Sequence, residues 1–270
     1  MAVMPAFEQI IRMEVVYRVP GMEDVTVERD RVYISPGGEA LRMDVYRPAR
    51  GTEGARPLVL MIHGGPIPKL GAKNMAVFTS WGRLLAASGL AAATFDHRFL
   101  APERMTDAAD DVAAALAHVR EHADALGIDR DRVAVWAFSG GGPLLSLALK
   151  GAPPFVRAVV AYYAALDVRE KPPGGSPAIT DDLRRDFSPA HHVRAEGGRT
   201  APVLVARAGL DHPFLNASID RFVAEALAAN AEIDVMNHPK GRHGFDFLDD
   251  DTRSREIIAR TIQFLRARLF

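Results

Sequence analysis

The chain has 270 residues, of which 48% are hydrophobic, so it can bury the core of a sizeable domain. Its formal net charge of -1 gives no reason to expect a nucleic-acid or membrane-surface partner, and the absence of cysteine excludes disulfides and thiolate chemistry. No signal peptide and no apolar run approaching the ~18–20 residues of a membrane span is recognisable, so we expect a soluble cytoplasmic protein.

Taken in chain order, the predicted strands begin with an alternating pair. Residues 25–34 and 41–46 alternate between apolar and polar side chains, which favours two antiparallel strands at one edge of a sheet. The later strands are continuous apolar runs, the pattern of parallel strands buried on both faces. These runs are residues 57–62, 90–95, 133–138, 156–162 and 202–206, followed by a weaker one at 233–236.

Helical periodicity fills the intervals between the later strands. Apolar residues recur at helical spacing over residues 112–123, 215–227 and 258–269, with Gly127 placed to end the first helix. Strands that alternate with helices predict a doubly wound, mostly parallel α/β sheet within a single domain of residues 1–270. For residues 1–21 the hypothesis is an extra helix that covers a site or meets another subunit.

The alternation of strand-like and helical patterns stops between residues 167 and 200. This stretch contains Pro172-Pro173-Gly174-Gly175 and Pro177 and shows little periodicity. Long irregular segments inside a domain are commonly functional or mobile. We interpret it as a short lid or insert within the domain.

A serine occupies the turn after the strand at 133–138. The run Ser139-Gly140-Gly141-Gly142 leads into a helix predicted from Pro143. A serine there projects from the carboxyl end of the sheet, where open α/β sheets bind ligands, and the helix start directs amide groups toward it. The alternative is a glycine-rich helix start that packs tightly or binds phosphate, but the run lacks the P-loop and dinucleotide patterns.

Two motifs resemble those of the α/β-hydrolase fold. The strand–serine–helix turn resembles its nucleophile elbow, with Ala137 in place of the first glycine, which implies that Ser139 is the nucleophile. The run His63-Gly64-Gly65-Pro66 resembles the oxyanion loop of lipases and esterases. Since Pro66 has no N–H, the resemblance implies oxyanion donors at Gly65 and Gly140, with Gly64 in reserve. His63 is interpreted as a structural brace of the loop.

A serine nucleophile needs a histidine base, and in α/β-hydrolases the base follows an acid later in the chain. His243 lies between the last predicted strand and the last predicted helix, in Gly-Arg-His-Gly-Phe, which is similar to the His-Gly-Phe of dienelactone-hydrolase-like families. We predict His243 as the base, with His238 as the alternative. The other histidines precede the serine, flank the insert or adjoin the acid: His63, His97, His118, His122, His191, His192 and His212.

The predicted acid is Asp211. It follows the strand at 202–206 in a Gly-Leu-Asp segment that resembles the acid loop of many α/β-hydrolases. Asp167, after the preceding strand, is the alternative acid, and Asp211 could also be an ordinary turn aspartate. His118 and His122, four residues apart on a predicted helix, could bind a metal, but solvated side chains on its outer face are the simpler interpretation.

Residues 96–103, Asp-His-Arg-Phe-Leu-Ala-Pro-Glu, are similar to the Asp-Tyr-Arg-Leu-Ala-Pro-Glu segment of hormone-sensitive-lipase-like esterases. We interpret Asp96 and Arg98 as structural residues that clamp loops under the site through charge-assisted hydrogen bonds. The resemblance extends from about residue 57 to the end of the chain. Dienelactone hydrolysis itself is disfavoured, because those enzymes use a cysteine nucleophile.

The predicted function is hydrolysis of carboxylic esters with small or short acyl groups through an acyl-enzyme on Ser139. Phe138, Tyr162 and Tyr163 are predicted to line the substrate pocket, no metal or other cofactor is expected, and the partner is a small-molecule ester. Two alternatives stay open: a peptidase or amidase of the prolyl-oligopeptidase-like type, and a hydrolase-like scaffold that binds a ligand without catalysis. A homodimer is also an open possibility.

Overall fold

The computed structural model describes residues 6–49, 54–67, 69–170 and 179–270. They contain one eight-stranded sheet with the order β1-β2-β4-β3-β5-β6-β7-β8, in which β2 runs antiparallel to both neighbours and every later pairing is parallel. The predicted mostly parallel sheet with an antiparallel edge is confirmed. The strands are β1 (Thr26–Ile34), β2 (Leu41–Arg47), β3 (Arg56–Ile62), β4 (Ala91–Phe95), β5 (Ile128–Phe138), β6 (Val156–Tyr162), β7 (Val203–Ala208) and β8 (Ile233–His238).

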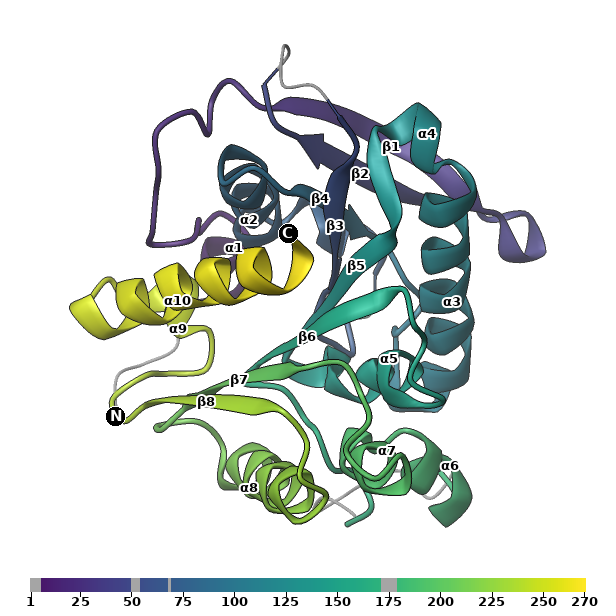
Figure 1. Ribbon diagram of the computed structural model, residues 1–270, viewed down its shortest axis with the longest axis vertical. Helices are drawn as coiled ribbons and strands as arrows, with labels where there is room; N and C mark the ends of the chain where they lie inside the picture. The colour runs from purple at the N-terminus through teal and green to yellow at the C-terminus, as the bar shows by residue number, and fades with distance from the viewer. Residues whose placement is uncertain (1–5, 50–53, 68, 171–178) are drawn as a thin grey trace.

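Helices cover both faces of this sheet, as Figure 1 shows. One hydrophobic core joins the sheet to α3, α4, α5, α7 and α8, and a second core on the opposite face joins it to α2 and α10. The α-helices are α1 (Phe7–Ile10), α2 (Ala76–Ala87), α3 (Met105–Glu121), α4 (Ala123–Leu126), α5 (Ser146–Leu149), α6 (Asp181–Asp186), α7 (Pro189–Ala195), α8 (Pro213–Ala228), α9 (Phe245–Leu248) and α10 (Thr252–Leu269). Short 3-10 helices are η1 (Pro36–Gly38), η2 (Ala72–Asn74), η3 (Pro102–Arg104) and η4 (Ser139–Leu145).

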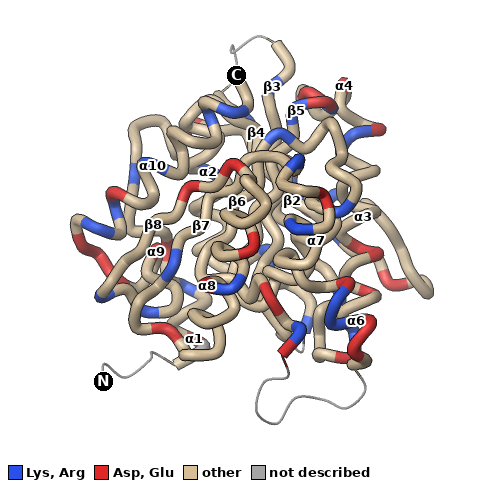
Figure 2. The backbone as a smooth tube through the Cα atoms, turned by 60° about the horizontal axis from the view of Figure 1, so that its bottom comes forward, with Lys and Arg blue, Asp and Glu red and all other residues tan. Residues whose placement is uncertain are grey.

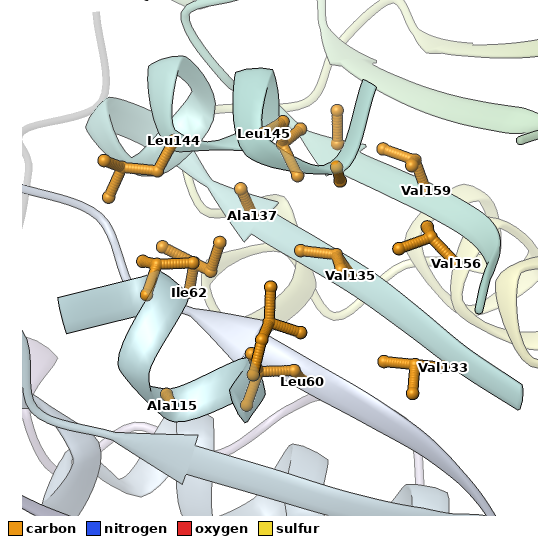
Figure 3. Packing of buried hydrophobic residues seen from close by; sticks show 14 of the residues in the cluster. Leu60, Ile62, Ala115, Val133, Val135, Ala137, Leu144, Leu145, Val156 and Val159 are labelled. Atoms are coloured by element: carbon orange, nitrogen blue, oxygen red, sulfur yellow. The ribbon is translucent and has the colours of Figure 1, made fainter. Parts of the chain in front are cut away.

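The end of β5 is held by the first of these cores (Figure 3). Val135 and Ala137 are two residues apart on β5, so their side chains point to the same face of the strand. They lie among Leu60 and Ile62 of β3 and Leu145 of η4. All five side chains are 1% exposed or less. Close packing of this kind leaves little freedom for the strand end that carries Ser139.

Three elements differ from the sequence-based expectation. β5 begins at Ile128, five residues earlier than predicted, because the backbone of Ile128 pairs with Arg56 of β3, although the four residues that follow Ile128 are polar. The helix expected from Pro143 is divided into η4 and the short α5. α2 was not predicted, yet Trp81 in its middle is completely buried and lies 4.5 Å from the ring of Trp136.

The predicted insert at 167–200 is described only in part, since residues 171–178 lie outside the described residues. Within it, Ala190 and Val193 of α7 are fully buried in the core, so this helix belongs to the layer on that face of the sheet. α6 packs outside α7, and its Leu183 borders a cavity described below. A lid function for the segment stays a prediction.

Charged residues of both signs are interspersed along the elements visible in Figure 2. α6 shows the mixture clearly, with Asp181, Asp182, Arg184 and Arg185 in consecutive turns. Of the helices formed by the described residues, none has the length and apolar character needed to cross a membrane.

Candidate active site

Ser139 follows β5 directly and has a backbone φ of 52°, in the left-handed region that non-glycine residues seldom occupy. The strained turn is held by a hydrogen bond in which the N–H of Ala165 donates to the carbonyl of Ser139 at 3.0 Å. Strain of this kind persists only where the surrounding structure imposes it, and it is concentrated at functional sites. The turn lifts the serine out of the sheet at its carboxyl edge.

Three predicted residues meet at this edge. Nε2 of His243 lies 2.8 Å from Oγ of Ser139, and Nδ1 of the same ring lies 2.7 Å from Oδ2 of Asp211. The carboxylate of Asp211 is 3% exposed, and its other oxygen accepts the N–H of His212 at 2.6 Å. The imidazole can therefore take the serine proton through Nε2 while the carboxylate holds the proton on Nδ1.

The loops that carry Asp211 and His243 are held by hydrogen bonds. The N–H of Leu210 donates to the carbonyl of Gly241 at 2.9 Å, which links the two loops. Asp249 accepts both the N–H and the Nε–H of Arg242, at 2.7 and 2.6 Å. Gly244 has a φ of 83°, which glycine adopts without steric cost. These contacts place the imidazole before any substrate arrives.

The alternative acid and base lie elsewhere. The carboxylate of Asp167 binds Arg169 and Arg221 at 2.9 and 3.0 Å. His238 is buried and its Nε2 lies 3.1 Å from Oγ of Ser254 on α10. Both residues are therefore engaged in structural contacts away from Ser139.

His118 and His122 are stacked on α3 with ring centroids 4.2 Å apart. Nε2 of His118 accepts a hydrogen bond from Arg31 at 2.9 Å. Over the described stretches of the chain, no group of three or more histidine or carboxylate side chains is arranged to hold a metal ion.

The predicted oxyanion loop lies directly against the elbow. A Cβ on Gly64 would come within 2.9 Å of Cβ of Ser139, and a Cβ on Gly140 would come within 1.8 Å of the carbonyl oxygen of Gly65. Glycine is therefore required at these positions by close approach of the two backbones. Among the described residues the N–H of Gly65 has no hydrogen-bond acceptor, which leaves it available to a ligand.

A cavity of about 270 Å³ opens beside Ser139. Phe138 and Tyr163, two of the residues predicted for the substrate pocket, line this cavity together with His243. The prediction for Tyr162 is wrong: its side chain is fully buried on the α10 side of the sheet, where its hydroxyl lies 2.6 Å from Oγ1 of Thr261. Tyr163, just past the strand end, has a backbone φ of 38° in place of extended geometry, and its ring borders the cavity.

A second cavity of about 230 Å³ lies on the other side of the elbow. Gly140 and Pro66 border it, and almost all of its lining is apolar. The predicted insert contributes Val168, Leu183 and Phe187 to its wall. The two cavities thus flank the oxyanion loop.

Comparisons with solved structures identify the architecture. An esterase from the Planctomycetes species Thermogutta terrifontis superposes with a TM-score of 0.73 over 96% of this chain and 96% of its own, at 20% identity. The chain has the α/β-hydrolase fold. Brefeldin A esterase, described as a bacterial homologue of human hormone sensitive lipase, superposes with the same TM-score at 20% identity, covering 97% of this chain and 81% of that esterase.

Sequence comparisons give partial matches. The BD-FAE family model matches residues 43–153. Esterase LipC of Mycobacterium tuberculosis is 26% identical over 237 residues, and the Preu6 non-reducing polyketide synthase of Preussia isomera is 33% identical over 157 residues. The matches cover 77% and 53% of this chain, but 57% of LipC and 7% of the synthase.

Several residues at the site were not predicted from the sequence. Phe78 and Met75 line the first cavity from the start of α2, and Ile10 lines it from α1. The spacing of Val77, Trp81 and Leu84 could have revealed α2, since it is helical. The contact of Ile10 bears out part of the hypothesis for residues 1–21, although residues 1–5 are outside the described residues.

The Asp96–Arg98 segment is structural, as predicted, but its two charged residues have different partners. Arg98 forms a two-point ion pair with the buried Asp111 of α3, with contacts of 2.7 and 2.9 Å. Oδ1 of Asp96 accepts the N–H of Gly71 at 2.8 Å and that of Lys73 at 3.3 Å. The segment therefore ties the end of β4 to α3 and to the loop before α2.

A buried carboxyl lies near His243 in the chain. Asp246, three residues after His243, accepts hydrogen bonds from the indole of Trp81 at 2.8 Å and the hydroxyl of Tyr163 at 2.7 Å. Burial raises the pKa of Asp246 from 3.8 to about 6, against the opposing effect of the two hydrogen bonds. No motif in the sequence indicated this group.

Proposed function

We propose that this protein is a serine hydrolase that cleaves carboxylic esters through an acyl-enzyme on Ser139. The observation that carries the proposal is the continuous hydrogen-bonded chain from Ser139 through His243 to Asp211. The proposal is supported by the names of similar proteins, which include brefeldin A esterase and esterase LipC. A single function accounts for the strained serine, the neighbouring imidazole and the buried acid.

The reaction follows from the positions of these groups. His243 removes the proton of Ser139 as Oγ bonds to the ester carbonyl carbon. The resulting oxyanion accepts hydrogen bonds from the N–H groups of Gly65 and Gly140, with that of Gly64 as a third, reserve donor. The imidazolium then protonates the alcohol oxygen as its bond to carbon breaks. Water, deprotonated by His243, attacks the acyl carbon, and Ser139 leaves with its proton restored. These steps use only side chains, backbone amides and water.

The two cavities suggest how an ester is oriented. The departing alcohol must receive its proton from His243, which lines the first cavity, so we assign the alcohol portion to that side. The acyl portion then extends past Gly140 into the second cavity. Because that cavity is small and apolar, it suits short, uncharged acyl groups, the preference expected from the short insert.

The test is a panel of nitrophenyl esters of increasing acyl length together with aminoacyl amides. We expect turnover of esters from acetate to about hexanoate, with slower turnover of longer esters and of amides. Preferred cleavage of amides would instead support the peptidase alternative. A folded protein that turns over neither class would support the ligand-binding alternative.

Ser139→Ala provides the variant for this test, and Ser146→Ala provides its matched control. Ser146 is buried seven residues further along the same segment and is absent from the linings of both cavities beside the elbow. Ser139→Ala should abolish turnover and covalent labelling by a fluorophosphonate probe, while Ser146→Ala should retain both. A cytoplasmic location and a homodimer stay predictions.

A further inference from the structure

Two histidines lie buried beneath the oxyanion loop, outside the reacting groups. His63 follows β3 and His97 follows β4, and their side chains are 4% and 1% exposed. Their rings are stacked, with centroids 3.6 Å apart and an interplanar angle of 10°. Phe78 and Phe95 are the neighbouring aromatic rings, with centroids at 6.1 Å from His63 and 5.7 Å from His97.

Each imidazole holds a backbone carbonyl of the loop. Nδ1 of His63 lies 2.7 Å from the carbonyl oxygen of Gly64, and Nε2 of His97 lies 3.2 Å from the carbonyl oxygen of His63. A carbonyl oxygen only accepts, so both of these ring nitrogens carry the proton. Nδ1 of His97 is then unprotonated and accepts the N–H of Phe99 at 3.4 Å. The contacts define one tautomer for each ring.

These bonds determine where the amides of the loop point. A peptide unit is planar, and in a trans unit its C=O and N–H groups point in opposite directions. The units that follow His63 and Gly64 are trans. Holding the carbonyl of Gly64 therefore directs the N–H of Gly65, and holding the carbonyl of His63 directs the N–H of Gly64. These are two of the three proposed oxyanion donors.

Both rings are suited to this task because they stay neutral. Burial lowers the pKa of His63 to about 4 and that of His97 well below its usual value. The tautomers defined above are therefore maintained at neutral pH, where the proposed hydrolysis would proceed.

We propose that His97 is a positioning residue of the oxyanion loop. Its hydrogen bond to the carbonyl of His63 directs the N–H of Gly64, and its stacked ring supports the ring of His63, which holds the carbonyl that directs the N–H of Gly65. The inference rests on the proposed ester hydrolysis at Ser139. His97 occupies the position that is tyrosine in the similar segment of hormone-sensitive-lipase-like esterases, and the inference gives this position a role. His97 lies away from the reacting atoms, and its effect should therefore be on transition-state stabilisation more than on substrate binding.

The test uses two substitutions of opposite character. His97→Phe keeps a ring in the stack but removes the donor, whereas His97→Gln can place an amide N–H near the position of Nε2. We expect His97→Phe to lower kcat about 10- to 100-fold with KM changed less than threefold. An aryl boronic acid, which forms a tetrahedral adduct with the serine, should lose affinity by a factor similar to the loss in kcat/KM. His97→Gln should recover most of both.

His192→Phe is the matched control. His192 is also a buried histidine that bonds a backbone carbonyl, with Nε2 2.8 Å from the oxygen of Asp186, but it lies on α7. The substitution His192→Phe should lower the midpoint of thermal unfolding while leaving kcat unchanged. If His97→Phe does not fold, His97→Asn provides the second variant, since its shorter amide cannot reach the carbonyl of His63 and should show the same loss of kcat.

Three outcomes would overturn the inference: unchanged kcat in a folded variant without the donor, a rise in KM alone, or no recovery in His97→Gln. Failure of the proposed function looks different. In that case the unmodified protein turns over no ester and Ser139 does not react with the fluorophosphonate probe. The wild-type measurement therefore separates the two ideas.

Discussion

At the scale of single residues, hydrogen-bond partners distinguish two aspartates that are chemically alike. Asp167 and Asp211 both follow strands at the carboxyl edge of the sheet, and both side chains are 3% exposed or less. Asp167 is bound by Arg169 and Arg221, whereas Asp211 is bound by the ring of His243. Only the second arrangement can orient a base.

This difference predicts opposite effects of one substitution at two sites. Asp211→Asn should lower kcat about 10³- to 10⁴-fold, because an amide no longer favours the required imidazole tautomer. Asp167→Asn should leave kcat within about threefold but lower the free energy of unfolding by about 2 kcal/mol, since two arginines lose a buried ionic partner. Steady-state kinetics and urea unfolding of both variants check this. Equal losses of kcat would contradict the assignment of the acid.

The crowded glycines of the site predict a second pair of results. Gly140→Ala should lower kcat at least 100-fold, because its Cβ would collide with the carbonyl of Gly65 and displace a proposed oxyanion donor. Ala137→Gly restores the usual elbow glycine and should leave kcat/KM within about twofold. It should cost about 1 kcal/mol of stability through added backbone freedom. Full activity in Gly140→Ala would argue against this oxyanion site.

At the scale of elements, one buried carboxyl connects the segments around the base. Asp246 receives hydrogen bonds from Trp81 of α2 and from Tyr163 at the end of β6. Its own carbonyl accepts the N–H of Val16, at 2.8 Å. The ring of Tyr163 in turn lies 4.7 Å from that of His243. The N-terminal segment, α2, the end of β6 and the loop of His243 therefore meet at a single residue, through its carboxyl group and its backbone carbonyl.

The raised pKa of Asp246 predicts a pH dependence of stability. Between pH 3.8 and about 6 the folded protein keeps a proton that the unfolded chain releases, so this group costs stability as the pH rises through that window. Asp246→Asn has no such titration, and its free energy of unfolding relative to wild type should rise by about 2 kcal/mol from pH 4 to pH 6.5. Urea unfolding at several pH values measures the difference. A difference independent of pH would contradict the prediction.

At the scale of the whole molecule, the site lies where segments from both ends of the chain converge on the carboxyl edge of the sheet. The first cavity receives Ile10 from the N-terminal segment and Phe247 from α9. The second lies between the sheet edge and the predicted insert, with Leu183 of α6 in its wall. The proposed substrate selection therefore depends largely on segments outside the central sheet.

The assignment of the acyl group to the second cavity predicts a change in chain-length preference. Leu183→Trp should fill that cavity and lower kcat/KM for butyrate esters at least tenfold relative to acetate esters. Leu227→Trp is the control, since Leu227 is 64% exposed on α8 and should tolerate the same change. Competition between nitrophenyl acetate and butyrate measures the ratio. If Leu183→Trp changes alcohol selectivity instead, the orientation of the ester is reversed.

Local patterns were sufficient for much of the fold. The strands and the larger helices other than α2 could be predicted from hydrophobic periodicity, because the apolar or polar character of each residue reflects which faces of an element are buried. The start of β5 could not be predicted in this way, since its pairing with Arg56 depends on the backbone of another strand. α2 was overlooked although Trp81 and Leu84 mark its buried face. η4 replaced a regular helix after Ser139, where the elbow packs against Gly65.

By itself the sequence determined the architecture and placed Ser139, Asp211 and His243 in loops after three different strands. Only the tertiary structure decided that Asp211 and not Asp167 meets the histidine, that Tyr163 and not Tyr162 faces the cavity, and that His97 lies beneath the oxyanion loop. The physical reason is that periodicity and turn chemistry are local properties of a chain. The partner of a carboxylate, the side to which a ring turns and the stacking of two imidazoles depend on segments that meet only when the sheet assembles.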